Sequence, residues 1–252
     1  MRIYTVSEIW RRRLVLLLVM VGLVLVTWIA LNRSGPAIGV ATNPQDRYSL
    51  RDVTTNKRAL ALTFDISWGT VMPSRVFHIL QRDHVLATFF VSGPWARQNP
   101  TLIKNMVKAG DQVESHGWAH VNYTGLSQSG IQENLQKAGQ VIEAITGRRP
   151  TLVRPPNGDF SPRTIAAARS LGYTTVTWGT DSLDWMNPGV STIIRRVVTR
   201  AHPGDIVLLH ASDTCKQTDL ALPAIVKDLR TQGYRLLTVS QLLAEGTPQY
   251  RG

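Results

Sequence analysis

Cysteine is almost absent from this chain of 252 residues, in which Cys215 is the only one. A single cysteine excludes an internal disulfide, so an apolar core must hold the fold together. The residues around Cys215 do not resemble the surroundings of a catalytic thiol. We therefore expect Cys215 to fill space in a partly buried position.

Glycine-rich phosphate loops, internal repeats and low-complexity tracts are also missing from the sequence. Gly69, which follows the first strand-like segment, stands too much alone to cradle a phosphate. These absences exclude a repeat architecture and a P-loop nucleotide site. The length fits one large α/β domain with a short appendage.

Acidic residues are scarce: 17 Asp and Glu stand against 28 Lys and Arg, which gives a net charge of +11. Four arginines and one glutamate within the first 31 residues supply +3, and the other residues keep +8. Such a basic chain favours an anionic envelope polymer or a layer of lipid headgroups as its partner. Charge alone does not choose between them.

One long apolar run, residues 14–31, contains no charged residue. As a helix, its 18 residues would rise about 27 Å, close to the roughly 30 Å hydrocarbon core of a bilayer. Arginines at 11–13 precede it, and Trp10 and Trp28 lie near its ends, which is typical of an anchor whose basic side stays in the cytoplasm. We predict a cytoplasmic segment at 1–13, a single transmembrane helix and an extracytoplasmic domain on the cell membrane.

A cleaved signal peptide is the alternative interpretation of this run. The small residues at 37–39 and 39–41 form possible cleavage patterns, but neither follows a short apolar region closely. Both interpretations export the remainder of the chain. Nucleic acid is therefore not an expected partner, whereas an envelope glycan is.

Beyond residue 58, apolar segments of strand length alternate with amphipathic ones. Seven segments have the length and composition of strands: 59–65, 85–91, 112–115, 152–154, 174–178, 206–210 and 235–239. Helical periodicity is clearest in three segments: 129–146, 164–171 and 220–232. Alternating strands and helices pair their strands in parallel through right-handed crossovers.

The predicted fold is therefore α/β, a distorted (β/α) barrel with about seven parallel strands, preceded by one N-terminal transmembrane helix. We place this domain at 59–245. The stretch 32–58 is rich in Asn, Arg, Gly, Pro and Thr and shows little periodicity, so we predict a stalk that becomes ordered where it meets the domain.

Polar residues follow several of these segments, at the strand ends where a (β/α) barrel carries its chemistry. His116 and His120 come after the strand at 112–115, and both rings can converge on one divalent ion if the chain coils there. We expect zinc, with cobalt or nickel as alternatives. Two histidines at this spacing also occur with purely structural roles.

Two other strand ends carry groups suited to proton transfer. Asp65 ends the first strand and can take a proton from water as a general base. His210 ends a strongly apolar strand, and its protonated ring can assist a leaving amine. Asp184 can raise the pKa of that histidine and orient its ring.

Arg154 begins a Pro-Pro loop that closes with Gly158, so the root of its guanidinium is fixed. A fixed guanidinium is suited to hold a carboxylate in one orientation. Trp68, Trp185 and Leu208 are expected to contact the substrate. Singly, each of these residues also fits a turn, a core or a surface ion pair.

Taken together, five segments resemble, in order and spacing, the motifs of the polysaccharide deacetylase family with the NodB-homology domain: Thr63-Phe64-Asp65, Ser115 to His120, Arg154 to Gly158, Asp181 to Trp185 and Leu208 to His210. The resemblance covers about residues 59–243. It implies a distorted (β/α) barrel that hydrolyses acetyl groups on envelope polysaccharides. It also implies the roles of base (Asp65), metal ligands (His116, His120), positioning residue for the base (Arg154), and acid with its tuning carboxylate and pocket (His210, Asp184, Trp185, Leu208).

One position departs from the family pattern. Ile66 stands where the family has its metal-binding aspartate, and an isoleucine binds no metal. A neighbouring carboxylate such as Glu114 or Asp213 would have to compensate. The variant Thr-Phe-Asp-Ile-Ser-Trp-Gly, with Ser212-Asp213 to Thr218, is similar to the PdaB-like sporulation subgroup, which implies a role with spore peptidoglycan.

The leading hypothesis is a membrane-anchored, metal-dependent deacetylase that removes N-acetyl groups from peptidoglycan-type glycans. The alternative, motivated by Ile66, is a catalytically impaired glycan-binding or envelope-assembly factor. A glycosidase would need two opposed carboxylates, for which Asp65 and Asp184 are candidates. That hypothesis leaves the histidines without a role.

Overall fold

The computed structural model describes Trp10, Arg13, Met20 and residues 48–251. The chain divides into two units, 1–42 and 43–252, and the second holds the sheet. Among the described residues, none of the helices has the length and apolar character needed to cross a bilayer. The anchor expected at 14–31 lies, apart from Met20, outside the described residues and stays a prediction.

Eight parallel strands form a curled sheet in the order β6-β5-β4-β3-β2-β8-β7, with β9 paired to the start of β2. Their bounds are β2 (Ala59–Ile66), β3 (Thr88–Val91), β4 (Gln112–Ser115), β5 (Leu152–Val153), β6 (Thr174–Thr175), β7 (Thr180–Asp181), β8 (Ile206–His210) and β9 (Arg235–Leu237). Each of the seven predicted strand segments overlaps one of these strands, and β7 was not predicted. The α/β class and the curled parallel sheet of the predicted distorted barrel are thereby confirmed.

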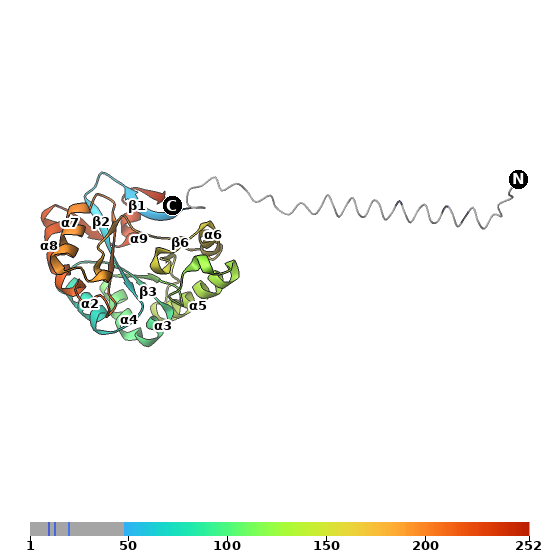
Figure 1. Ribbon diagram of the computed structural model, residues 1–252, viewed down its shortest axis with the longest axis horizontal. Helices are drawn as coiled ribbons and strands as arrows, with labels where there is room; N and C mark the ends of the chain where they lie inside the picture. The colour runs from blue at the N-terminus through green and yellow to red at the C-terminus, as the bar shows by residue number, and fades with distance from the viewer. Residues whose placement is uncertain (1–9, 11–12, 14–19, 21–47, 252) are drawn as a thin grey trace. The chain divides into compact units, whose positions relative to one another are not determined.

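Helices cover the outer side of the sheet (Figure 1). Their bounds are α2 (Val71–Arg82), α3 (Gly93–Gln98), α4 (Pro100–Ala109), α5 (Gln128–Thr146), α6 (Pro162–Ser170), α7 (Val190–Arg200), α8 (Thr218–Thr231) and α9 (Val239–Leu243). Local signals set several ends: Gly147 ends α5 in a left-handed conformation with φ 72°, and Ser161 opens α6 in a capping box with Thr164. The end of α5 at Thr146 agrees with the predicted segment 129–146, whereas α6 begins two residues before the predicted segment 164–171.

The strand β2 separates two apolar layers because its side chains alternate between the faces of the sheet. Ala59 and Ala61 belong to the cluster inside the curled sheet, where small side chains leave room for neighbours. Leu62, Phe64 and Ile66 belong to the larger cluster that packs against the helices. All eight residues of the strand are buried. The same alternation turns the side chain of Asp65, between Phe64 and Ile66, to the face opposite the helices.

A two-stranded antiparallel ribbon joins the two ends of the described domain. Its strands are β1 (Ser49–Thr54) and β10 (Thr247–Arg251). The ribbon lies between the edges of the curled sheet, because Leu50 bridges to Val176 after β6 and Asp52 bridges to Asp205 before β8. It therefore closes the side of the barrel that the parallel strands leave open.

The ribbon changes the domain boundaries expected from the sequence. β1 lies inside the range assigned to a stalk, and the folded domain begins before Ala59 and extends past residue 245. The physical reason is that each ribbon strand is stabilised by the other end of the chain. Such a partner leaves no local signal in the sequence.

Candidate active site

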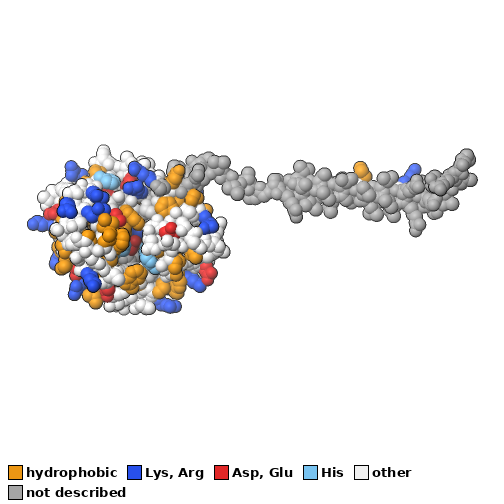
Figure 2. Space-filling model, in the orientation of Figure 1, with side chains coloured by type: hydrophobic (Ala, Val, Ile, Leu, Met, Phe, Trp, Pro, Cys, Tyr) orange, Lys and Arg blue, Asp and Glu red, His pale blue; other side chains and the backbone are white. Residues whose placement is uncertain are grey.

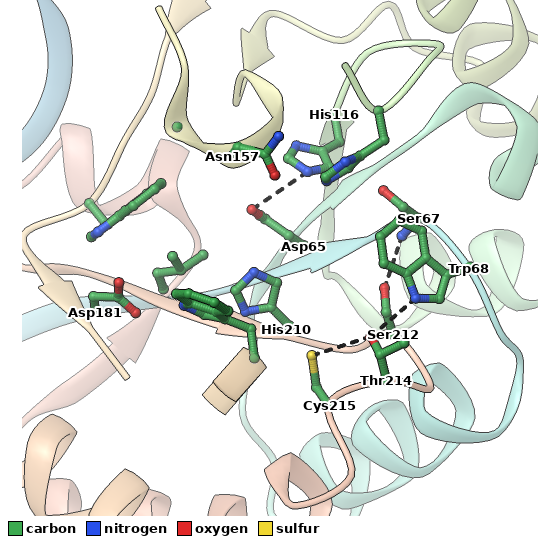
Figure 3. Close-up of a pocket in the computed structure, with 15 residues that line it drawn as sticks. Asp65, Ser67, Trp68, His116, Asn157, Asp181, His210, Ser212, Thr214 and Cys215 are labelled. Carbon is green, nitrogen blue, oxygen red and sulfur yellow. Dashed lines mark hydrogen bonds and ion pairs between the residues drawn. The ribbon is translucent and has the colours of Figure 1, made fainter. Parts of the chain in front are cut away.

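The carboxyl ends of the central strands surround a cavity of about 410 Å³. Asp65 and His210 are register partners on the neighbouring strands β2 and β8, so their side chains leave the same face of the sheet. His116 follows β4, and Arg154 follows β5 and donates its backbone N–H to the carbonyl of Ser115. Figure 3 shows Asp65, His116 and His210 directed toward one space.

Asp65 is held by a buried ion pair. The Arg154 guanidinium, which has no exposed surface, donates from Nη1 to Asp65 Oδ1 at 2.8 Å and from Nη2 to the carbonyl of Thr177 at 2.9 Å. It lies 4.2 Å from the centre of the Phe90 ring, which favours a cation. Burial alone raises the pKa of the Asp65 carboxyl, but the charge and hydrogen bond of Arg154, together with the protonated His210, outweigh burial and lower it. Asp65 is therefore an ionised carboxylate, ready to accept a proton.

His116 is fixed in one tautomer by its surroundings. Its Nδ1 lies 2.8 Å from the carbonyl oxygen of Arg154, which can only accept, so Nδ1 carries the proton. The lone pair on Nε2 faces the cavity, 3.8 Å from Asp65 Oδ2. Burial lowers the pKa of His116 to about 4, which keeps the ring neutral at physiological pH. A neutral, oriented imidazole is the form that binds metals.

His120 completes the pair but is held differently. Its ring centroid is 5.3 Å from that of His116 and 5.2 Å from the Trp68 ring, both in edge contacts. Its side chain is exposed, although partial burial still lowers its pKa. The two histidines predicted as a pair are thus adjacent, one buried and one at the mouth of the cavity.

A second acid–base pair joins the half-buried His210 to the buried Asp184. The Nδ1 atom of His210 lies 2.7 Å from Asp184 Oδ1, and the backbone N–H of His210 donates to Asp184 Oδ2 at 2.7 Å. Thr218 donates its hydroxyl to Oδ2 as well, at 2.7 Å. Burial lowers the pKa of His210, but the Asp184 carboxylate outweighs it and raises the pKa above its usual value. His210 therefore retains a proton that its other nitrogen can deliver into the cavity.

The predicted substrate contacts all line the cavity. Leu208 is a buried wall, and Trp68 and Trp185 are large aromatic side chains with 43% and 51% of their surface exposed. Trp68 Nε1 donates to Thr214 Oγ1 at 3.1 Å, which holds its ring at the mouth. Flat exposed rings at a cavity mouth suit the apolar faces of sugar rings.

Other lining residues were not among the predicted site residues. They come from loops whose contribution depends on tertiary packing: Ser67, Asn157, Gly158, Trp178, Asp181, Ser212, Thr214 and Cys215. Several of them lie within segments that the sequence analysis singled out: Asn157 and Gly158 in Arg154 to Gly158, Asp181 in Asp181 to Trp185, and Ser212, Thr214 and Cys215 in 212–218. Cys215 is more buried than expected, and burial raises the pKa of its thiol to about 12, so it is an inert part of the wall.

The position of Ile66 explains the missing carboxylate ligand in structural terms. Its side chain is fully buried in the helix-facing cluster, on the opposite face of β2 from Asp65. Neither compensating carboxylate reaches the cavity. Glu114 accepts from Gln112 and from the backbone N–H groups of residues 151 and 152, and Asp213 accepts from the first backbone N–H groups of α2.

The described residues therefore fit a divalent ion only in part. The His116 lone pair and the adjacent His120 ring supply two nitrogen donors of the kind that zinc prefers. Within the described part of the chain, no cluster of three His, Cys, Asp or Glu residues could hold a metal ion. Two histidines are thus the only predicted ligands that the cavity retains.

Comparisons with known proteins agree with this geometry. Residues 52–176 match the family model described as polysaccharide deacetylase. A peptidoglycan-N-acetylglucosamine deacetylase of Bacillus cereus is 35% identical over 199 residues, which cover 78% of this chain and 93% of that protein. The peptidoglycan-N-acetylmuramic acid deacetylase PdaA of Bacillus subtilis is 31% identical over 76% of this chain and 73% of its own length. The chain belongs to the polysaccharide deacetylase family.

A solved structure gives a second kind of relative. BA3943 of Bacillus anthracis, described as a CE4 family pseudoenzyme, superposes with a TM-score of 0.73 at 32% identity over 79% of this chain and 70% of its own. A mutant of BA3943 is described as having restored enzymatic activity and superposes equally well. The chain spans only 59% of the length of YlxY from Bacillus subtilis, an uncharacterised relative that is 32% identical. Both active and inactive proteins therefore share this fold.

Proposed function

We propose that this protein hydrolyses N-acetyl groups on peptidoglycan-type glycans. The observation that carries the proposal is the presence, at one cavity, of two proton-transfer groups that each have a buried charged partner: Asp65 held by Arg154, and His210 held by Asp184. Two such pairs with opposite pKa shifts assign a base and an acid. A protein that only binds glycans needs neither.

The reaction follows from these positions. Asp65 accepts a proton from a water whose oxygen attacks the acetyl carbonyl carbon. His210 then donates its proton to the nitrogen as the C–N bond breaks, which releases acetate and an amine on the sugar. Arg154 keeps the base ionised and oriented, while Trp68 and Trp185 hold the sugar rings at the mouth.

His116 and His120 are the residues that would hold a divalent ion, zinc above all, with cobalt or nickel as alternatives. Such an ion supplies polarisation of the acetyl carbonyl and a lower pKa of water at the site. Loss of one charged ligand predicts weak binding of the ion. His116 also hydrogen-bonds Arg154, so it orients the proton-transfer residues whether or not an ion is bound.

We further propose that the enzyme is anchored in the cell membrane through residues 14–31, with its domain outside, and serves the spore envelope. The arginine-flanked apolar run supports the anchor. The sequence resemblance to the PdaB-like subgroup supports the link to spores. Basic side chains spread over the visible face of the domain suit an anionic envelope (Figure 2).

One observation favours a second candidate function. Ile66 faces the helices instead of the cavity, and the relative BA3943 is described as a pseudoenzyme. The second candidate is a glycan-binding or envelope-assembly factor without turnover. It uses the same aromatic mouth but predicts no acetate release.

Acetate release decides between the two candidates. The fragment from Asn32 to the C-terminus is incubated with N-acetylglucosamine oligomers and with peptidoglycan, with and without zinc or cobalt. We expect metal-stimulated release that is lost in Asp65→Asn and reduced in His116→Ala. If no sample releases acetate while the protein still binds glycan, the second candidate, a glycan-binding factor, is established.

A further inference from the structure

A second cavity of about 250 Å³ adjoins the catalytic one, and we call it the ribbon cavity. The two cavities share Gly158 and Trp178 in their linings. Gly158 lies flat against the indole, because a Cβ built there would be 2.6 Å from a ring carbon of Trp178. The two cavities therefore lie next to each other, on either side of this contact.

The ribbon cavity carries positive charge only. Besides the two shared residues, its lining consists of Ser49, Arg51, Phe160, Thr177, Gly179 and Arg251. No carboxylate is among them. Both arginine side chains are exposed, and neither forms an ion pair with any residue that the structure describes.

The strand pairing places both arginines at this cavity. In the β1–β10 ribbon, Leu50 pairs with Tyr250 and Asp52 pairs with Gln249, so Arg51 is the extra residue of a β-bulge. Bulges redirect side chains and are common beside active sites. Arg251 pairs with Ser49 on the same ribbon.

One residue connects the ribbon cavity to the catalytic machinery. Thr177 shares a hydrogen bond of 2.8 Å with the Ser49 hydroxyl, and its carbonyl accepts from Arg154 Nη2 at 2.9 Å. The ribbon is thus tied to the residue that orients Asp65.

We propose that the ribbon cavity is a subsite for a carboxylate on the glycan, such as the lactyl carboxylate of a muramic acid residue next to the sugar in the catalytic cavity. This inference rests on the proposed function, because it names the substrate class of the same site. Guanidinium groups match the planar geometry of carboxylates, and a neutral sugar would leave both cations without a carboxylate partner among the described residues.

Titration calorimetry on the full chain in detergent tests the subsite without turnover. The probes are a tetrasaccharide of alternating N-acetylglucosamine and N-acetylmuramic acid with free lactyl carboxylates, and the same glycan with these groups converted to methyl amides. We expect wild type to bind the acid about fivefold more tightly than the amide, since two exposed ion pairs contribute modestly. The preference should shrink at high salt.

Arg51→Gln and Arg251→Gln should each reduce this preference, and the double variant should abolish it while leaving binding of the amide unchanged. Arg195→Gln, an equal charge loss at an exposed position on α7, should keep the preference. Equal binding of acid and amide by wild type, or a preference that survives in the double variant, would overturn the subsite.

Acetate release from neutral N-acetylglucosamine oligomers separates this inference from the proposed function. Release without a preference for the acid overturns the subsite and leaves the deacetylase in place. A preference for the acid without release from any glycan supports the subsite in a binding protein. Loss of binding to both glycans overturns both proposals.

Discussion

The two halves of the catalytic cavity differ in how completely the protein holds them. In the proton-transfer half, Asp65 and His210 each have a buried charged partner. In the histidine half, His116 is buried and held by a carbonyl, whereas His120 is exposed and makes edge contacts with the rings of His116 and Trp68. The proton-transfer half is therefore part of what stabilises the barrel, whereas the histidine half is not.

His116 links the two halves through contacts with both Arg154 and Asp65. Its Nδ1 is bonded to the backbone of Arg154, and its Nε2 lies near Asp65. A change at the histidines therefore affects the proton-transfer half mainly through this residue. Substitutions can test whether the halves are separable.

Arg154→Met should have the largest effect, because it leaves the Asp65 carboxylate buried without a counter-charge. We expect a loss of about 3 to 5 kcal/mol in the free energy of unfolding. Arg154→Lys keeps the charge but not the fork, and should lose less stability while still lowering activity. Urea unfolding at pH 7 measures the free energy of unfolding of both variants. A stable Arg154→Met variant would show that the proton-transfer half is not part of the core.

Ile66→Asp tests the histidine half by placing a carboxylate at the position of the missing metal ligand. In the presence of EDTA we expect a loss of about 3 kcal/mol in stability, because the carboxylate enters an apolar cluster. Ile66→Val is the control and should lose about 1 kcal/mol. The decisive measurement is the change in melting temperature when zinc is added to each variant and to wild type.

If zinc raises the melting temperature of Ile66→Asp more than that of wild type, the carboxylate has turned toward the histidines. The end of β2 would then have rearranged. An accompanying gain in acetate release would show that the wild-type site lacks only this one metal ligand. Equal zinc responses would show that the strand holds residue 66 on the helix side.

Removing the histidines one at a time should have a smaller effect, on zinc affinity. We expect His116→Ala to weaken zinc binding about 10- to 100-fold, because it removes an oriented donor. His120→Ala should weaken it less, since the exposed ring must first be ordered. Competition with a chromophoric chelator measures both, with His202→Ala as the control outside the cavity. Equal losses would contradict the asymmetry between the two histidines.

The smallest expected effect concerns the titration of His210. Asp184→Asn removes the carboxylate that raises the pKa of His210, so the ring should lose its proton at a lower pH. Nuclear magnetic resonance of labelled histidines follows this directly, and Asp181→Asn should shift the pKa in the same direction by less. An unchanged titration in Asp184→Asn would remove Asp184 as the tuning group.

The same pKa sets the sign of two pH dependences. The folded pKa of His210 is raised, so its stabilising contribution is complete below the pKa of an unfolded histidine and is lost as pH rises through the folded value. Activity that needs the protonated ring falls over the same range. In Asp184→Asn this alkaline decline should begin at lower pH.

Much of the catalytic cavity was predictable because strand ends carry local signals. The apolar segments before Asp65 and His210 fixed both the strands and the residues that emerge from them. The Pro-Pro loop after Arg154 located a residue that proves fully buried. The direction of Ile66 also follows from alternation along β2, once the extent of that strand is known.

The remaining parts could not be predicted, because they depend on contacts between distant segments. Trp178 and Asn157 enter the cavity from loops, and Asn157 does so in a left-handed conformation with φ 58°. β7 has two residues, too few for a periodic signal. The β1–β10 ribbon joins residues about as far apart as the chain of the domain allows.

The ribbon also determines when the domain can become complete. Ser49 pairs with Arg251, and that pairing closes a loop that contains the whole parallel sheet. β1 has no ribbon partner until β10 (Thr247–Arg251) is present, so the ribbon cavity needs both segments before it can form.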